Sequence, residues 1–203
     1  MANPQINVLL FGKRRPPRSV AALPSHTIDG PADIDAAVQG ADRVLVIGTD
    51  SDLAAVLTRL MRTDLLGIEV AHLPGRRGAV RARTAAAQRV PLIRDETGTV
   101  IVGSAHWLPP AGASTVHGEA VVDDAMLFNG DVAAVRIEPT YGPPGLRAAI
   151  ATGPLRRRRW ISGRAVQLGT TGVRVLRDGV AAPREARRST FYRHTTGWLR
   201  VGS

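Results

Sequence analysis

The chain has 203 residues, of which 44% are hydrophobic and none is cysteine. That length and composition are typical of a globular protein with one large core or two small domains, and the lack of cysteine excludes disulfides, thiol nucleophiles and thiolate metal sites. The 27 basic residues outnumber the 17 acidic ones, so the net charge is +10. This charge favours anionic partners such as phosphorylated ligands, acidic membranes or nucleic acid, although a codon bias toward arginine would produce it as well.

The sequence contains no stretch near the roughly 20 consecutive apolar residues that a membrane span needs. The apolar segment at residues 6–12, INVLLFG, is short and runs into KRRPPR, which is not the pattern of a secretory signal. We therefore expect a soluble, cytoplasmic protein without a transmembrane segment.

Residues 6–11, INVLLF, predict a first buried strand, and residues 12–19 predict a basic loop that Pro16 and Pro17 keep from being helical. A short amphipathic helix is expected at residues 33–39. It leads into a second strand, and a right-handed crossover would make the two strands parallel.

Residues 43–60, RVLVIGTDSDLAAVLTRL, predict a strand, a tight turn and a helix. The run at 44–47 is continuously apolar and branched, which is typical of a central strand buried on both faces of a parallel sheet. Helical spacing begins by Leu53, with Asp50 in the turn and Ser51 or Asp52 placed to cap the first turn. Such a turn points backbone N–H groups and the positive end of a helix dipole at one spot, as a phosphate site requires.

A third strand is expected at residues 67–71, and the pattern changes after Arg89. Residues 91–102 predict a hairpin, and the segments beyond are short, alternating and separated by Gly and Pro. The predicted fold class is α/β, with an N-terminal three-layer subdomain on a parallel sheet (1–89) and a C-terminal, mainly antiparallel β subdomain (90–203). We expect the last strand, 198–201, to close the β subdomain.

The turn after the central strand resembles the glycine-rich GGDGT nucleotide loop of diacylglycerol-kinase-type lipid kinases and NAD kinases. Two of the five residues, a glycine and an aspartate, are those of the family. The resemblance implies that the loop contacts nucleotide phosphates. The five matched positions are Gly48, Thr49, Asp50, Ser51 and Asp52.

Residues 73–80 occupy the place of a PLGTGND-like turn of the same family, and Gly75 is the matching residue. Arg76 and Arg77 stand where the family has polar residues. Because guanidinium groups bind phosphate oxygens bidentately, this pair is a candidate phosphate clamp. The resemblance also implies that the basic residues at 13–15 lie near the phosphates. The alternatives are a basic helix start and a basic loop that both face water.

Two stretches of the second half extend the resemblance. Residues 121–132 are similar to an acidic VDDG stretch, with Asp123 and Asp124 as the matching acids and candidate metal ligands. Residues 173–180 resemble the strand and DGE turn near the end of these kinases. Asp178 matches the catalytic acidic residue, which would accept the proton of the attacking hydroxyl, while Val180 replaces the glutamate.

The resemblance implies a cleft between the subdomains that binds a nucleotide or phosphorylated lipid, and transfer of a phosphoryl group from ATP with Mg²⁺ to a lipid hydroxyl. Several substitutions oppose this activity. Asp52 brings a negative charge to the phosphate loop, and Thr49 and Ser51 replace glycines that allow close backbone approach. We therefore predict weakened or lost ATP use.

The alternative function is that of a non-enzymatic, basic accessory protein that binds nucleic acid or an acidic membrane surface. The four arginines at 156–159, followed by Trp160, would suit either partner. The five histidines show no metal-ligand spacing, and neither a GxSxG nor a GxxxxGK[ST] motif is present.

Overall fold

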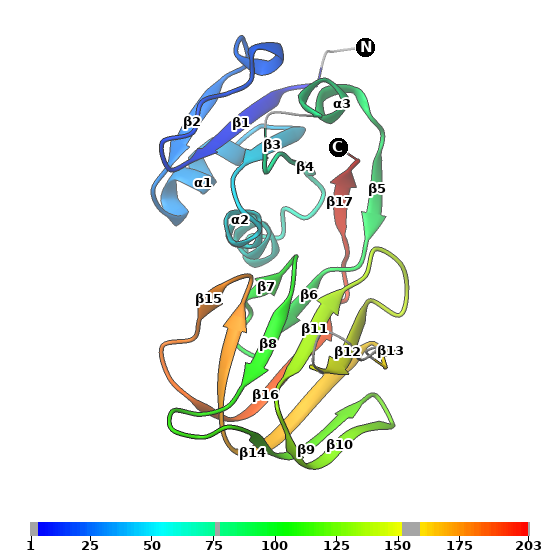
Figure 1. Ribbon diagram of the computed structural model, residues 1–203. Coiled ribbons are helices and arrows are strands. Elements are labelled where there is room, and N and C mark those ends of the chain that lie inside the picture. Colours follow the sequence, from blue (N-terminus) through cyan, green and yellow to red (C-terminus); the bar gives the residue numbers. More distant parts are fainter. Residues whose placement is uncertain (1–3, 76–77, 152–158, 203) are drawn as a thin grey trace. The chain divides into compact units, whose positions relative to one another are not determined.

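A computed structural model of the chain describes residues 4–75, 78–151 and 159–202 (Figure 1). The chain forms two compact units, one made of residues 1–90 and 196–203 and the other of residues 91–195. We call them the α/β unit and the β unit. Within the described ranges, no helix is long and apolar enough to cross a membrane.

The α/β unit is built on one sheet with the strand order β2-β1-β3-β4-β17-β5. Neighbouring strands are parallel throughout, except that β17 and β5 are antiparallel. The predicted central parallel strand is confirmed, because β3 is buried along its whole length and lies between β1 and β4. The strands are β1 (Ile6–Phe11), β2 (Ser25–Ile28), β3 (Arg43–Ile47), β4 (Glu69–His72), β5 (Ala87–Val90) and β17 (Trp198–Val201).

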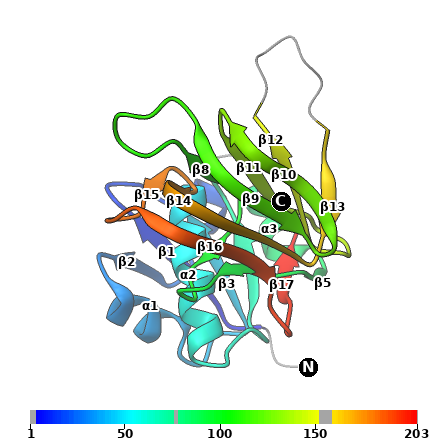
Figure 2. The same ribbon diagram turned by 90° about the horizontal axis from the view of Figure 1, so that it is seen from below.

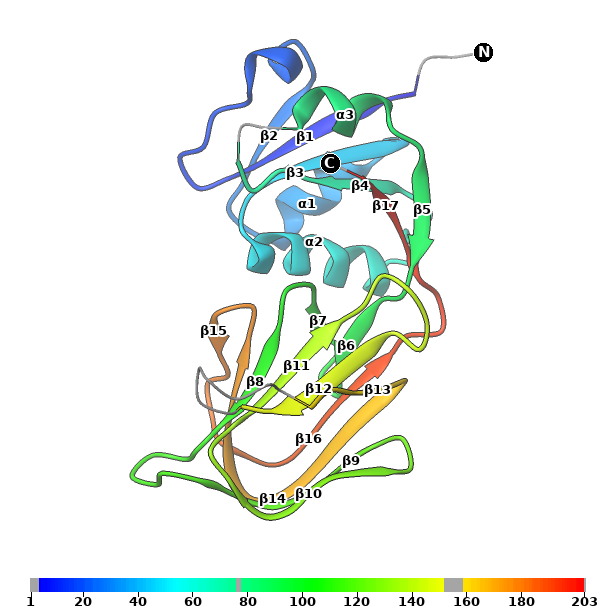
Figure 3. The ribbon, with the colours of Figure 1, turned by 45° about the vertical axis from the view of Figure 1, so that its right-hand side comes forward.

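Helices cover both faces of this sheet, which makes the predicted three layers (Figure 3). One face carries α1 (Pro31–Val38) and α2 (Asp50–Arg62), and the Asn7 side chain of β1 donates to the carbonyl of Ala37 in α1 at 2.7 Å. The other face carries α3 (Ala79–Thr84) and a short 3-10 helix, η1 (Arg18–Val20). Their side chains Val20, Ala79 and Ala82 share a buried cluster with strand residues.

The last strand corrects the predicted domain organisation. Instead of closing the β subdomain, β17 lies between β4 and β5 in the sheet of the α/β unit, where Trp198 and Val201 are only 5% and 1% exposed. Because β4 and β5 are separated, each offers an unpaired edge, and a terminal strand that joins both satisfies two rows of backbone groups.

The β unit contains antiparallel strands, as predicted, and its first hairpin joins β6 to β7. The long strand β14 pairs with β16 and β9 through its first half and with β8 and β15 through its last residues (Figure 2). The strands are β6 (Ile93–Asp95), β7 (Val100–Ile101), β8 (Ala105–Leu108), β9 (Val116–Val122), β10 (Ala125–Val132), β11 (Val135–Pro139), β12 (Leu146–Ile150), β13 (Ile161–Gly163), β14 (Ala165–Arg177), β15 (Val180–Ala181) and β16 (Ala186–Arg193).

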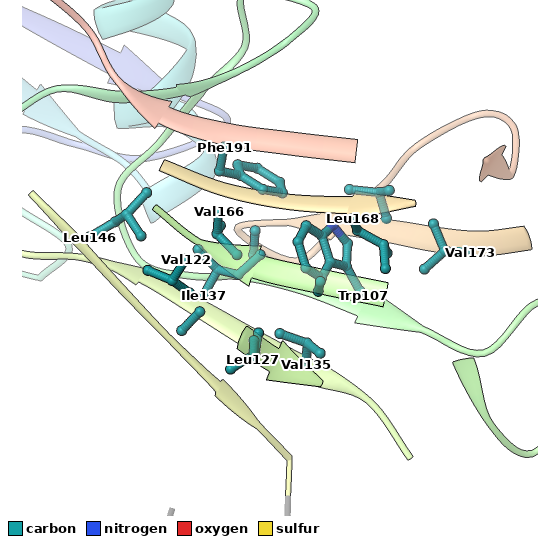
Figure 4. Close-up of a cluster of buried hydrophobic side chains, with 14 of the residues drawn as sticks. Trp107, Val122, Leu127, Val135, Ile137, Leu146, Val166, Leu168, Val173 and Phe191 are labelled. Carbon is teal, nitrogen blue, oxygen red and sulfur yellow. The ribbon is translucent and has the colours of Figure 1, made fainter. Parts of the chain in front are cut away.

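Alternating inward residues of these strands form the core of the β unit (Figure 4). Trp107 and Phe191 are fully buried there, and their ring centroids lie 6.2 Å apart. The indole N–H of Trp107 donates to the Ser189 hydroxyl at 2.9 Å, so the polar end of this large side chain keeps a partner inside the core.

A carboxylate between two arginines lies on the opposite face of β11 and β12. Glu138 accepts hydrogen bonds from Nε of Arg136 at 2.7 Å and from Nη2 of Arg147 at 2.6 Å, and the Arg147 guanidinium stacks on the Trp160 ring. Burial raises the pKa of Glu138, but the hydrogen bonds from Arg147 and Arg136 outweigh it and hold the pKa below the ordinary value.

Removing the carboxylate of Glu138 should therefore destabilise the β unit only at neutral pH. Because the folded-state pKa is lowered, its stabilisation is present above the ordinary glutamate pKa and is lost as the pH falls through the folded value. We expect Glu138→Gln to lower the free energy of unfolding by about 1 kcal/mol at neutral pH and to have no effect once both states are protonated. Urea denaturation checks this, with exposed Glu119→Gln as control. An equal loss in the free energy of unfolding at neutral pH and at a pH where both states are protonated would contradict this prediction.

Trp198→Ala should destabilise the α/β unit, because it removes a buried aromatic side chain from a strand that joins two others. The expected loss in the free energy of unfolding is about 3–5 kcal/mol. Hydrogen exchange should show lost protection in β4 and β5, whereas β8 to β12 stay protected. The control is Leu199→Ala, which removes a half-buried side chain from the same strand and should lower the free energy of unfolding by less. Loss of protection confined to the β unit would show that β17 has been misplaced.

Candidate functional site

The turn after β3 is closed by its own side chains. The hydroxyl of Thr49 accepts the backbone N–H of Asp52 at 3.3 Å, while Oδ2 of Asp52 accepts the backbone N–H of Thr49 at 2.7 Å and its hydroxyl at 2.8 Å. This reciprocal arrangement is a capping box. The N-terminal cap of α2 is thus Thr49, and of the two predicted capping residues Asp52 takes part as its reciprocal partner. The signal was present in the sequence as a Thr-x-x-Asp pattern.

Gly48 is required by this turn without any ligand. A Cβ atom on Gly48 would lie 2.6 Å from Oδ2 of Asp52 and 2.7 Å from its Cβ atom, distances at which one of the groups would have to move. The match of Gly48 to the nucleotide loop therefore has a sufficient explanation in the packing of Asp52 against the end of β3.

The structure brings two more polar side chains to this turn. Arg14, from the loop after β1, places Nη1 3.5 Å from Oδ2 of Asp52, with both side chains partly exposed. His72 ends β4 and places Nε2 3.1 Å from the carbonyl oxygen of Gly48 and Nδ1 3.8 Å from a carboxylate oxygen of Asp50. Sequence reasoning missed His72, because only strand pairing brings it beside β3.

The second predicted phosphate contact follows β4. Gly75 is exposed and has open space where a Cβ atom would lie, so local packing does not demand glycine there. Arg76 and Arg77 lie outside the described residues, and the predicted arginine clamp stays a prediction. Gly78, with a φ of 84°, precedes α3 at its N-terminal cap, a conformation that favours glycine.

Asp178 occupies a two-residue hairpin turn between β14 and β15. Asp178 and Gly179 have φ values of 46° and 85°, as the tight turn of an Asp-Gly hairpin requires. The Asp178 carboxylate accepts three backbone N–H groups of the neighbouring loop, from Val102 at 2.9 Å, Gly103 at 2.8 Å and Ser104 at 2.9 Å. Both oxygens are engaged, so the side chain has a structural task at this position whether or not it acts as a base.

Asp123 and Asp124 occupy a similar turn between β9 and β10. Asp123 has a φ of 51°, and its carboxylate accepts the backbone N–H groups of Arg164 and Ala165, each at 2.9 Å. Over residues 4–75, 78–151 and 159–202, no three Asp, Glu or His side chains gather as metal ligands would. The carboxylate oxygens of Asp123 already accept backbone N–H groups, and the assignment of Asp123 and Asp124 as metal ligands stays a prediction.

The predicted base and the predicted metal ligands do not converge. Asp123 binds the first residue of β14, whereas Asp178 follows the last. The strand has 13 residues and changes its partners along its length, with a register shift between Gly169 and Val173.

No protein-family model matches the sequence, and no curated protein sequence matches it either. Solved structures do match over the whole chain. A diacylglycerol kinase from Bacillus anthracis strain Sterne is 9% identical and superposes with a TM-score of 0.75 over 100% of this chain and 99% of its own. An NAD kinase from Archaeoglobus fulgidus in complex with ATP is 10% identical, with a TM-score of 0.65 over 97% and 93% of the two chains.

A yeast NADH kinase complexed with NADH is 8% identical, with a TM-score of 0.61 over 99% of this chain and 84% of its own. The chain therefore has the fold of diacylglycerol kinases and NAD kinases. The resemblance drawn from short motifs is confirmed at the level of the fold.

The role of Asp178 as a turn residue can be tested without any substrate. Asp178→Asn leaves one carbonyl oxygen for three backbone N–H groups and should lower the free energy of unfolding by about 2 kcal/mol. Asp124→Asn is the matched control on the other hairpin, with an expected change within about 0.5 kcal/mol. Denaturant unfolding measures both. An unchanged stability of Asp178→Asn would show that the carboxylate is free for another use.

Proposed function

We propose that this protein, built on the fold of diacylglycerol and NAD kinases, binds a nucleotide or phosphorylated lipid and has little or no ATP-dependent kinase activity. The ligand site is the carboxyl edge of the parallel sheet in the α/β unit, and the proposed location is the cytoplasm. The observation that carries the proposal is the Asp52 carboxylate, which lies at the N-terminus of α2 beside Arg14.

The carboxyl edge has the features of an anion site. Strands β1, β3 and β4 end there side by side, and open parallel sheets bind ligands at this edge. The N-terminus of the 13-residue helix α2 follows directly from β3 and contributes a positive dipole end. Arg14 and His72 reach the same turn from the neighbouring strands.

The same edge opposes a phosphate where a kinase would hold it. The Asp52 carboxylate accepts the Thr49 amide that a phosphate oxygen would otherwise use. Repulsion between a carboxylate and a phosphate oxygen about 4 Å away is on the order of 1 to 4 kcal/mol in a solvated site, so ATP affinity would fall by roughly tenfold to several hundredfold.

The contacts of the proposed catalytic base, Asp178, also support a proposal of little or no kinase activity. Transfer to a lipid hydroxyl needs a base, and the Asp178 carboxylate already accepts backbone N–H groups of Val102 and Gly103. ATP with Mg²⁺ would supply the phosphoryl group if turnover survives. The function that the geometry supports best is therefore ligand binding, with Arg14 and the proposed pair Arg76 and Arg77 as phosphate contacts.

Asp52→Thr tests the proposal directly. It removes the negative charge from the turn and should strengthen ATP binding at least tenfold, as measured by isothermal titration calorimetry with Mg²⁺ present. Asp64→Asn makes the same change in net charge at an exposed residue with a φ of 56°, which asparagine tolerates. This control should leave the affinity unchanged.

Two results would contradict the proposal. Tight wild-type binding that Asp52→Thr does not alter would mean that Asp52 points away from the ligand. Efficient phosphorylation of a lipid hydroxyl by the wild-type protein would show that the closed turn does not impair catalysis.

A further inference from the structure

Charge is unevenly distributed along the part of the chain that builds the α/β unit. The segments 12–28 and 70–90 contain nine Lys and Arg residues and no Asp or Glu. The segment 29–66 contains seven Asp and three Arg. The first two segments build η1 and α3, and the third builds α1 and α2 on the opposite face of the sheet (Figure 3).

The basic segments form a joined surface. The Arg83 guanidinium of α3 donates to the carbonyl of Ser19 in η1 at 2.9 Å. Val20, Ala79 and Ala82 turn inward and are 1%, 3% and 0% exposed, so the side chains on the outer side of η1 and α3 face solvent. We call the exposed set Arg18, Val80, Arg81 and Arg83 the basic face.

The basic face also carries an exposed apolar residue, Val80. Its side chain is 65% exposed on α3, beside Arg81. An exposed branched apolar residue among arginines suits a lipid interface, where the apolar group inserts among the acyl chains and the arginines bind headgroup phosphates. When the face is exposed only to water, the Val80 side chain contributes no hydrophobic stabilisation.

We infer that the basic face docks on an anionic lipid bilayer. Arginine forks match phosphate oxygens. The segments that build this face contain no carboxylate, and that of Glu69 is paired with Arg43, whose guanidinium donates to the carbonyl of Arg83. Nucleic-acid surfaces commonly add aromatic rings for stacking or amides for base contacts. The segments 12–28 and 78–86 contain no Phe, Trp, Tyr, Asn or Gln, so the observations favour lipid over nucleic acid.

This docking does not rest on the proposed ligand site. Arg18 and Arg81 lie on the helices of the opposite face from α2, whose N-terminus forms the proposed anion site. Vesicles can be assayed without nucleotide, so a failure to bind ATP and a failure to bind lipid are separate outcomes.

The test is cosedimentation of the full chain with vesicles of equimolar phosphatidylglycerol and phosphatidylcholine. The wild type should bind these vesicles, should not bind pure phosphatidylcholine vesicles, and should dissociate as salt rises. Each arginine near an anionic surface contributes about fivefold in partitioning, so Arg18→Gln with Arg81→Gln should weaken binding by about 25-fold. Val80→Ser should weaken it by about fivefold.

The matched control is Arg187→Gln with Arg188→Gln, which removes the same charge from exposed residues of β16 and should leave partitioning within about twofold. Thermal unfolding confirms that each variant folds. Equal losses in the two double variants would overturn the inference, because they would show that only net charge matters. Failure to bind vesicles, with tight binding to duplex DNA that Arg18→Gln and Arg81→Gln abolish, would assign the face to nucleic acid and overturn it as well.

Discussion

Three aspartate carboxylates that accept backbone N–H groups hold together the turns of this molecule at which a ligand site was predicted. Asp52 closes the turn between β3 and α2, Asp123 ties a hairpin to the start of β14, and Asp178 organises the loop before β8. Unpaired backbone amides are costly, and an ionised acceptor satisfies several at once. Each carboxylate therefore has a structural role. A catalytic or binding role would use a carboxylate that already accepts backbone N–H groups.

The fold of the structural relatives is retained at very low sequence identity. The chain superposes over its full length on a diacylglycerol kinase with a TM-score of 0.75, yet only 9% of residues are identical. A sheet with helices on both faces tolerates such divergence, because core positions require only apolar character and suitable volume. Phosphate chemistry requires particular groups at particular atoms, and in this chain Asp52 accepts the backbone N–H of Thr49.

The sheet of the α/β unit also separates a helical layer rich in aspartate from a helical layer rich in arginine. Its central strand β3 is buried on both faces, so the acidic layer of α1 and α2 and the basic layer of η1 and α3 are held apart by apolar residues such as Val8, Leu45 and Val46. Within the acidic layer, Asp35 pairs with Arg59 across the two helices. The segments that contain η1 and α3 have no acidic residue, and Arg18 and Arg81 on these helices are exposed.

The sequence by itself determined the elements whose signals are local. Residues 6–11 form β1 as predicted, the apolar run at 44–47 forms the centre of the sheet, and the hairpin after Pro91 is present. Tertiary structure alone decided the sheet to which Trp198–Val201 belongs, since a strand pattern does not reveal which edges are open. It also decided what Asp178 binds, because the amides it accepts lie 74 to 76 residues away in the chain. Periodicity reports the burial of one segment, whereas the partner of a strand or a carboxylate depends on every other segment that packs beside it.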